Sequence, residues 1–184
     1  MKLQEAKQAL RKDMASLKRS YEKTTLLDLS VKIMSRLEET KLFQQASCIA
    51  LYHALPGEVQ TADFIEKWHK QKRLLLPLVK GNDLQLLLYA GKESVKTGAF
   101  GIWEPTEECE VVPEEEIDLV IVPGVAFDRQ HNRLGRGKGF YDRLLSTLSA
   151  PKIGICYDFQ LKELIPIEPF DKKMDLILTE KETL

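Results

Sequence analysis

The sequence predicts a single α/β domain with three layers, Rossmann-like, built around a mainly parallel but mixed sheet. Short apolar runs of strand length alternate with amphipathic helical segments, which is the pattern of helices packed on both faces of a parallel sheet. The length of 184 residues suits one hydrophobic core, and 43% hydrophobic with 30% charged residues is a globular composition. We therefore expect one domain over residues 1–184.

Four segments have the apolar spacing of a helix that buries one face. In the first segment the apolar positions include Leu3, Leu10 and Leu17, with Lys and Arg on the other sides. Thr24 or Thr25 is expected to cap the second helix, because threonine side chains accept hydrogen bonds from free amides at helix starts. The four predicted helices cover residues 2–20, 25–39, 61–70 and 139–148.

Five apolar runs rich in Ile, Val, Leu and aromatic residues predict buried strands. The third run follows the second after the short turn KGND, which predicts an antiparallel hairpin within the sheet. A last strand is expected just after Asp175, in the sequence DLILTE, and Asp175 itself is interpreted as a turn or cap residue. The five runs cover residues 47–53, 73–79, 84–90, 117–123 and 152–157.

The overall charge excludes a global attraction for anions. Lys and Arg total 27 and Asp and Glu total 28, a formal net charge of -1, so any anion site must be local. We expect no binding to nucleic acid or to membrane surfaces. The acidic stretch at residues 104–116 is interpreted as a solvated loop.

Cysteine usage and the start of the chain favour a cytoplasmic protein. Cys48, Cys109 and Cys156 are odd in number and lack C-x-x-C spacing, which argues against a disulfide framework and a zinc knuckle. The first twenty residues lack the apolar core of a secretory signal, and no run approaches the ~18 apolar residues of a membrane helix. No apolar heptad seam is visible, so we expect a monomer.

The chemically informative segment, VPGVAFDRQHNRLGRGKGFYDRLL, covers residues 122–145. A predicted strand ends at Pro123, and glycines then alternate with cations through residues 135–139 before a helix begins. A loop that leads from a strand into a helix N-terminus offers free amides to anions, and alternating glycines let successive amides converge. Arg136 and Lys138 would add charge-assisted bonds. The segment predicts a phosphate-binding loop.

Spacing excludes two common phosphate loops. Lys138 is followed by glycine where a Walker A loop needs Ser or Thr, and Phe140 stands where a dinucleotide fingerprint needs glycine. Local charge supports an anion site, because residues 128–143 hold five cations against two carboxylates, a net charge of +3. The five cations are Arg129, Arg133, Arg136, Lys138 and Arg143.

The strings PGVAFD and NRLGRGKGFYDRLL closely resemble the signature of the 5-formyltetrahydrofolate cyclo-ligase family, PGxxFDxxGxRLGxGxGYYD. The resemblance extends over nearly the whole chain, because a basic N-terminal helix, an L-x-x-E-V-x-T element and a late acidic pair follow in the family's order. It implies an enzyme that converts 5-formyltetrahydrofolate to 5,10-methenyltetrahydrofolate and releases ADP and phosphate. ATP as co-substrate and Mg²⁺ are therefore expected.

The resemblance implies a nucleotide site formed by the N-terminal helix and the glycine loop. Lys7 and Arg11 match the family's K-x-x-L-R element and share a helix face, while Arg136 and Lys138 are the expected catalytic residues that stabilise the transferring phosphoryl group. The implied ATP-binding residues are Lys7, Gln8, Ala9, Leu10, Arg11, Arg133, Leu134, Gly135, Arg136, Gly137, Lys138, Gly139, Phe140 and Tyr141.

On the folate side, the resemblance implies contacts from HALPGEVQT, residues 53–61. The carboxylate of Glu58 is suited to paired N–H donors on a pterin edge. Trp103 and Tyr157 are aromatic residues that either stack on a flat ligand ring or belong to the core. The implied substrate-binding residues are His53, Glu58, Arg136, Gly137, Lys138, Gly139 and Phe140.

Two carboxylates match the family's metal ligands, Asp142 after the glycine loop and Asp171 near the C-terminus. Mg²⁺ takes few protein carboxylates when phosphate oxygens complete its shell, so two are sufficient. Two positions depart from the family pattern. Phe140 stands where Tyr is usual, and Phe170 precedes Asp171 where a polar residue is common.

Two other functions remain open from the residues alone. A nucleic-acid-binding module could use the basic glycine loop as a backbone clamp, and it would bind RNA with strong salt dependence. A sugar-phosphate isomerase or an acyl-carrier-type transferase would use the loop for a single phosphate. Turnover of ATP that depends on folate separates the cyclo-ligase from both.

Overall fold

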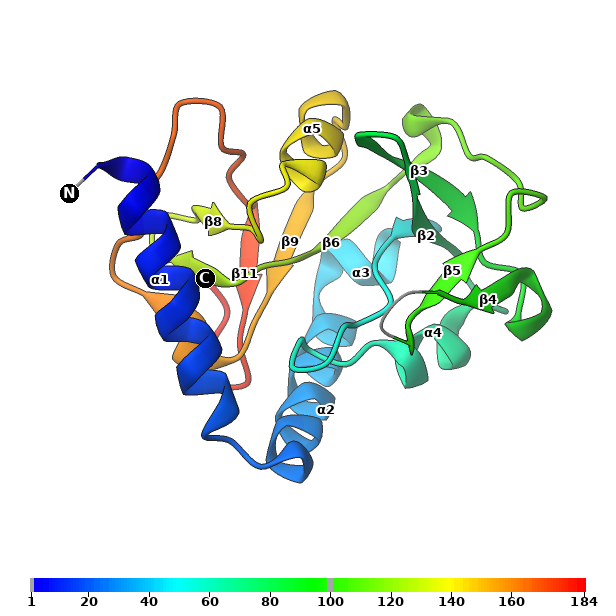
Figure 1. The fold of residues 1–184 in the computed structure, drawn as a ribbon. Coiled ribbons are helices and arrows are strands. Elements are labelled where there is room, and N and C mark those ends of the chain that lie inside the picture. Colours follow the sequence, from blue (N-terminus) through cyan, green and yellow to red (C-terminus); the bar gives the residue numbers. More distant parts are fainter. Residues whose placement is uncertain (1, 99–100) are drawn as a thin grey trace.

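The computed structural model describes residues 2–98 and 101–184 and has a six-stranded sheet at its centre (Figure 1). The strand order is β11-β9-β6-β1-β2-β3. Only the β2–β3 pair of this sheet is antiparallel, which confirms the mainly parallel, mixed sheet and the predicted hairpin. The strands are β1 (Cys48–Ala50), β2 (Arg73–Lys80), β3 (Asp83–Leu88), β6 (Leu119–Pro123), β9 (Lys152–Ile155) and β11 (Leu176–Leu178).

The four predicted helices are confirmed. Their bounds lie close to the predicted ranges. The predicted cap of α2 is wrong, because the helix begins at Lys23 with Glu22 before it, so Thr24 and Thr25 lie inside its first turn. A short helix, α3, was not predicted, and the Thr40 hydroxyl caps it by accepting from the Phe43 amide at 3.2 Å. The helices are α1 (Leu3–Arg19), α2 (Lys23–Glu39), α3 (Lys41–Gln45), α4 (Ala62–Trp68) and α5 (Phe140–Thr147).

The two faces of the sheet are buried in separate hydrophobic clusters, which makes three layers. Strand alternation divides β2 between them, because Leu74 and Leu76 face one cluster and Leu75 faces the other. The first cluster contains apolar residues of α2, α3 and α4, and the second contains Leu144 and Leu145 of α5. The α/β architecture predicted from the alternating segments is therefore confirmed.

A small three-stranded sheet lies beside the glycine loop, and two of its strands fall between β6 and that loop, where a loop was expected. It consists of β7 (Ala126–Asp128), β8 (Arg133–Leu134) and β10 (Leu161–Lys162). The buried Asp128 carboxylate fixes the turn between β7 and β8 by accepting hydrogen bonds from the backbone amides of Asn132 at 2.9 Å and of Ile165 at 3.1 Å. Met14 of α1 packs on this sheet, which places α1 beside the glycine loop (Figure 1).

The acidic stretch forms part of the outer edge of the sheet. A second hairpin joins β4 (Val95–Thr97) to β5 (Trp103–Pro105), and the acidic residues follow it. Their side chains are mostly exposed, as expected, but Glu110 and Glu116 pair with Arg73 at 3.2 and 2.6 Å. These carboxylates therefore balance charge on β2 and not on the glycine loop.

The direction of the strand order reverses between β1 and β6. From β1 the sheet continues to β2 and β3 on one side, and from β6 to β9 and β11 on the other. In such sheets the carboxyl ends of the two central strands open a crevice in which ligands bind. No helix among the described residues is long and apolar enough to cross a membrane, and Cys48, Cys109 and Cys156 are free thiols.

Candidate functional site

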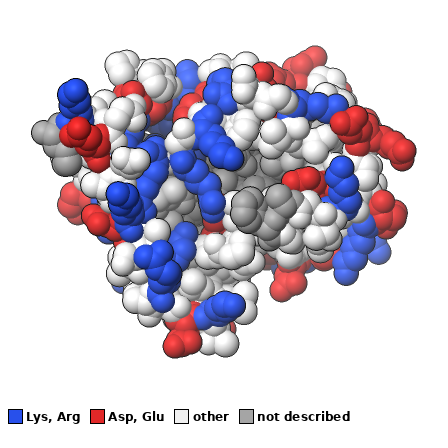
Figure 2. Space-filling model, in the orientation of Figure 1, with Lys and Arg blue, Asp and Glu red and all other residues white. Residues whose placement is uncertain are grey.

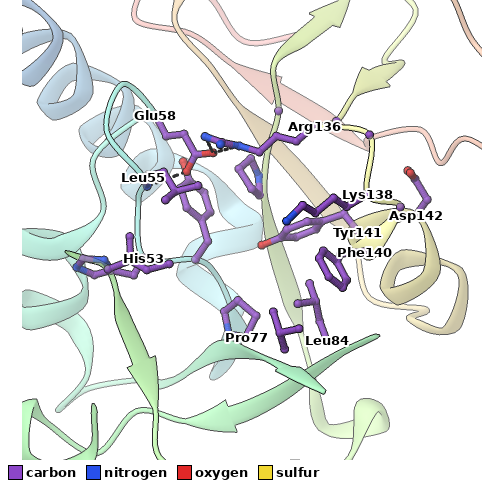
Figure 3. A pocket seen from close by; sticks show the side chains of 18 of the residues that line it. His53, Leu55, Glu58, Pro77, Leu84, Arg136, Lys138, Phe140, Tyr141 and Asp142 are labelled. Atoms are coloured by element: carbon purple, nitrogen blue, oxygen red, sulfur yellow. Dashed lines mark hydrogen bonds and ion pairs between the residues drawn. The ribbon is translucent and has the colours of Figure 1, made fainter. Parts of the chain in front are cut away.

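Two pockets lie at this crevice, on opposite sides of the glycine loop. The first, the hairpin pocket, is bounded by Pro77 and Leu84 of the β2–β3 hairpin and by the chain after β1, including His53 and Glu58 (Figure 3). The second, the α1 pocket, is lined by Gln4, Lys7, Arg11, Arg133, Leu134, Gly135, Gly137, Gly139, Asp142, Glu168, Phe170 and Asp171.

One wall is common to both pockets. Five residues line each of them, and they come from β8, the glycine loop and the first turn of α5: Arg133, Gly135, Gly137, Gly139 and Asp142. The backbone of the loop is therefore reachable from both sides. A ligand in one pocket lies next to a ligand in the other.

The glycines of the loop are required by its conformation. Gly137 has φ +95° and Gly139, which precedes α5, has φ +70°, values that a side chain disfavours. The Arg11 guanidinium lies against the loop, donating from Nε to the Gly135 carbonyl at 2.8 Å, and a Cβ on Gly137 would lie 3.3 Å from its Cζ. Arg11 thus connects α1 to the loop.

Arg133 is a buried cation in the common wall. It is 6% exposed and donates to the Pro123 carbonyl at 3.0 Å and to Asp142 Oδ1 at 3.2 Å. Its guanidinium also lies over the Tyr141 ring, 5.4 Å from the centroid. Its Nε is buried and has no hydrogen-bond partner among the described residues.

Glu58 and Arg136 close one end of the hairpin pocket. Arg136 donates from Nη2 and Nε to Glu58 Oε1 at 2.9 and 3.2 Å, and Glu58 Oε2 accepts from the Leu55 amide at 2.9 Å (Figure 3). The carboxylate that we expected to face a pterin edge is thus paired with a loop arginine. The same pair attaches the chain after β1 to the glycine loop.

His53 is held in one tautomer at the edge of the hairpin pocket. Its Nδ1 accepts from the Trp103 amide at 3.1 Å, and the two rings stack at 4.5 Å. Burial lowers the pKa of His53, so the ring is neutral near pH 7 and carries its proton on Nε2.

The two aromatic residues with open roles both pack against other rings. Trp103 stacks on Tyr89 as well as on His53, and Tyr157 is fully buried and donates to the Glu58 carbonyl at 2.9 Å. Neither is among the residues that line the two pockets. Their core role is therefore the one the structure favours.

Lys7 is engaged with two carboxylates at the α1 pocket. Its Nζ lies 2.8 Å from Glu168 and 2.7 Å from Asp171. Burial acts to lower the pKa of Lys7, but the hydrogen bonds and charges of Asp171 and Glu168 outweigh it, and the pKa is raised above 10.5. Figure 2 shows other Lys and Arg side chains spread over α1 on the same face of the molecule.

Helical geometry separates the expected nucleotide-binding residues of α1. Lys7 and Arg11 are four apart and face the pocket together. Gln8 and Ala9 are exposed on other faces, and Leu10 packs on the small sheet, so these three do not line either pocket.

The expected loop residues divide between the two pockets in a similar way. Leu134 lines the α1 pocket, whereas Arg136, Lys138, Phe140 and Tyr141 line the hairpin pocket. The side chains that alternate with the glycines therefore point to the hairpin pocket, and the α1 pocket is left with the backbone of the loop.

The two expected metal ligands line the same pocket. Asp142 uses Oδ1 for Arg133, and Asp171 uses Oδ2 for Lys7 and the Glu168 amide. Within the described residues no cluster of three His, Cys, Asp or Glu side chains could hold a metal alone. The donor set therefore fits a Mg²⁺ ion only when phosphate oxygens complete its shell, which is the usual arrangement with nucleotides.

The net charge of +3 over residues 128–143 is less concentrated at the glycine loop than the sequence suggested. Arg129 turns to Glu163 and Glu182 at 3.2 and 2.7 Å, and Arg143 pairs with Asp83 at 3.0 Å. Lys138 makes no ion pair in the part of the chain that the structure describes. Figure 3 shows its side chain beside Tyr141, directed into the hairpin pocket.

Several lining residues were not predicted. Pro77, Val79 and Leu84 form the apolar wall of the hairpin pocket, and Gln4 and Glu168 line the α1 pocket. The hairpin was recognisable in the sequence, but nothing in its apolar pattern distinguishes a pocket wall from core. The position of Glu168 three residues before Asp171 was the one available signal.

Comparisons with known proteins agree with the resemblance in the sequence. Residues 3–180 match the model of the 5-formyltetrahydrofolate cyclo-ligase family. A Haemophilus influenzae 5-formyltetrahydrofolate cyclo-ligase is 38% identical over 136 residues, covering 70% of this chain and 73% of its own length. The structure of Aquifex aeolicus 5,10-methenyltetrahydrofolate synthetase superposes with a TM-score of 0.88 at 38% identity, over 96% of this chain and 91% of that chain. A Mycoplasma pneumoniae 5,10-methenyltetrahydrofolate synthetase gives 0.77 at 29% identity, over 95% and 98%.

Proposed function

This chain belongs to the 5-formyltetrahydrofolate cyclo-ligase family, and from that premise we propose that it closes 5-formyltetrahydrofolate to 5,10-methenyltetrahydrofolate at the expense of ATP, with the folate in the hairpin pocket and the nucleotide in the α1 pocket. The observation that carries the assignment is the common wall. The glycine loop borders both pockets, so a phosphoryl donor in one pocket and a formyl acceptor in the other would lie next to each other at this loop.

The chemistry requires activation of a poor electrophile. Nitrogen donation stabilises the N5-formyl carbonyl, so its oxygen first attacks the γ-phosphorus and the bond from that phosphorus to ADP breaks. N10 then adds to the formyl carbon and loses its proton, and the carbon–oxygen bond breaks to release inorganic phosphate. Phosphoryl transfer of this kind depends on positioning and on neutralising charge, and no nucleophilic side chain is needed.

The α1 pocket suits a triphosphate. Lys7 and Arg11 supply two cations from one helix face, and the residues of the loop that border this pocket are Gly135, Gly137 and Gly139, whose backbone is open to a ligand. The buried Arg133 adds a third cation, since it lines the same pocket. We assign Lys7, Arg11 and residues 133–139 to the nucleotide.

The hairpin pocket suits a flat, partly apolar substrate with a polar edge. Pro77 and Leu84 provide an apolar wall, and the Glu58 carboxylate and the His53 Nε2–H donor provide opposite kinds of hydrogen-bonding group. Lys138 and Arg136 reach into this pocket from the loop, so the transferred phosphoryl group would meet them as it leaves the nucleotide. They are the proposed catalytic residues.

Mg²⁺ would be held by Asp142 and Asp171 together with phosphate oxygens. When bound, it would neutralise phosphate charge and orient the nucleotide. The residues' own part is to present one carboxylate oxygen each to the α1 pocket while Arg133 and Lys7 hold the other oxygen.

We propose a monomeric, single-domain, cytoplasmic enzyme that acts on small molecules and does not bind nucleic acid or membranes. The pairing of Arg129, Arg136 and Arg143 with carboxylates supports one part of this, the absence of nucleic-acid binding, because it leaves less of the segment's charge for a nucleic-acid backbone.

The test is an assay of purified protein with 5-formyltetrahydrofolate, ATP and Mg²⁺, followed by the absorbance of the methenyl product. We expect product only when both substrates are present, and we expect Lys138→Ala to lower kcat by roughly 100-fold, the cost of losing one transition-state donor. Lys12→Ala, which removes a cation on an exposed face of α1, is the control and should leave kcat unchanged. An absence of product from the unmodified protein would refute the assignment.

A further inference from the structure

An exposed phenylalanine stands at the rim of the α1 pocket. Phe170 is 61% exposed, although it is a large apolar side chain, and it lines the pocket together with Lys7 and Arg11. The other lining residues are charged, polar or glycine, except Leu134, which is 1% exposed. Phe170 is therefore the accessible apolar surface among the residues that border this pocket.

The turn that carries Phe170 is fixed rather than free. Residues 168–171 form a β-turn in which the Asp171 amide donates to the Glu168 carbonyl at 3.1 Å, with Pro169 in the second position, where its φ is favoured. The Asp171 carboxylate returns a bond by accepting from the Glu168 amide at 2.8 Å. Phe170 thus occupies the third position of a turn closed in both directions.

Helix α1 holds this turn from the other side of the pocket. Lys7 Nζ contacts both Glu168 and Asp171, and Gln4 Nε2 donates to Glu168 Oε1 at 2.9 Å. The side chains that border the pocket therefore also determine where Phe170 stands. An exposed aromatic ring with a constrained backbone, next to two cations and a glycine loop, is a built feature of the pocket.

We propose that Phe170 is the stacking surface for the base of the nucleoside triphosphate. This inference rests on the proposed function, because it takes the phosphates to lie on the glycine loop. A nucleotide has an anionic end and a flat, apolar end, and aromatic side chains bind any base through its π-face. The pocket offers cations and amides for the first and Phe170 for the second.

The test compares ATP with inorganic tripolyphosphate, which has the phosphates but no base, by calorimetric titration without folate. Phe170→Ala is expected to weaken ATP binding by roughly 10-fold, which is the scale of one base–aromatic contact, and to leave tripolyphosphate binding unchanged. Phe170→Tyr should retain ATP affinity because it keeps the ring. Ile167→Ala, which removes a 44% exposed apolar side chain of the same segment outside the pocket lining, should bind ATP like the unmodified protein.

Each other outcome overturns the proposal in a recognisable way. Equal loss of ATP and tripolyphosphate affinity in Phe170→Ala would mean that the ring only supports the turn. Unchanged ATP affinity in Phe170→Ala, with unmodified protein still turning over ATP, would refute the stacking role and leave the proposed function intact. Absence of ATP binding by the unmodified protein would instead refute the nucleotide dependence itself, and the stacking role with it.

Discussion

Arg136 and Glu58 are 78 residues apart in the chain and form a two-pronged ion pair that joins the glycine loop to the turn after β1. The carboxylate is largely buried, with 11% of its side chain exposed, whereas the guanidinium is 53% exposed. A carboxylate held in this way is oriented before any ligand arrives. This end of the hairpin pocket is therefore preformed by the loop that also borders the α1 pocket.

Glu58→Gln should weaken folate binding selectively. The neutral amide loses the ion pair and cannot accept paired N–H donors as strongly, so we expect KM for 5-formyltetrahydrofolate to rise about 10-fold or more, with ATP affinity within about twofold. Steady-state kinetics with each substrate varied gives both values. Glu104→Gln, the same change on another wall of the hairpin pocket, is the matched control. An equal effect in the control would assign the loss to pocket charge in general.

Gly137→Ala should impair function more than stability. Its φ of +95° disfavours a side chain by roughly 1–2 kcal/mol, and the new Cβ would press on the Arg11 guanidinium. We expect a higher KM for ATP, because both the loop and one of its cations move. Gly81→Ala is the control, since Gly81 has φ +62° with nothing within 4 Å and lies in the β2–β3 turn. Urea unfolding should show similar losses for the two variants, and a similar loss of activity as well would contradict the prediction.

Lys7 should stabilise the protein up to strongly alkaline pH. Its pKa is raised above the unfolded value of 10.5, so its contribution is complete below that value and is lost as pH rises through the folded pKa. Lys7→Met should therefore be less stable than the unmodified protein by roughly 1–3 kcal/mol near neutral pH, and the gap should close in alkali. Urea unfolding from about pH 8 to about pH 12 measures it, because the loss begins only above the unfolded pKa. Lys12→Met should show no gap, and a gap that persists in alkali would place the effect in packing.

The histidines 53 and 131 should have opposite tautomers. His53 Nδ1 accepts from a backbone amide, so its proton is on Nε2, whereas His131 Nδ1 lies 3.1 Å from the Met174 carbonyl and must donate to it. Nitrogen-15 NMR of the imidazole rings near neutral pH distinguishes the two forms. The same tautomer in both rings would contradict the arrangement around Trp103.

The titration of His53 gives a separate test. Burial lowers its pKa, so its contribution to stability is complete above the unfolded value of 6.5 and is lost as pH falls through the folded pKa. The NMR titration midpoint of His53 should therefore lie below 6.5, with the signal assigned by its disappearance in His53→Asn. A midpoint at or above 6.5 would show that the ring is not desolvated as the structure requires.

Long periodic elements and the loop signature could be predicted from the sequence, and short or distant features could not. The helices α1 and α2 repeat their apolar spacing over several turns, and the glycine loop has a string that few functions share. Strands β7 and β8 have three and two residues, which is too few to show alternation. Their hairpin was therefore missed.

Charge counting failed for a different reason. The net charge counted over residues 128–143 is correct, but the carboxylates that pair with Arg129 lie 34 and 53 residues further along the chain. The same limit applies to the pockets. The α1 pocket is lined by side chains from distant parts of the chain. They come together because α1 docks against the small sheet, and no local sequence pattern encodes that docking.

The contact between Lys7 and Asp171 joins positions 164 residues apart, so the α1 pocket is made from segments that are synthesised at widely separated times. During translation α1 is made before residues 168–171 exist, so Lys7 has neither of its carboxylate partners until that segment follows. The α1 pocket is therefore complete only after residues 168–171 have been synthesised, and a nascent chain that lacks them also lacks this side of the pocket.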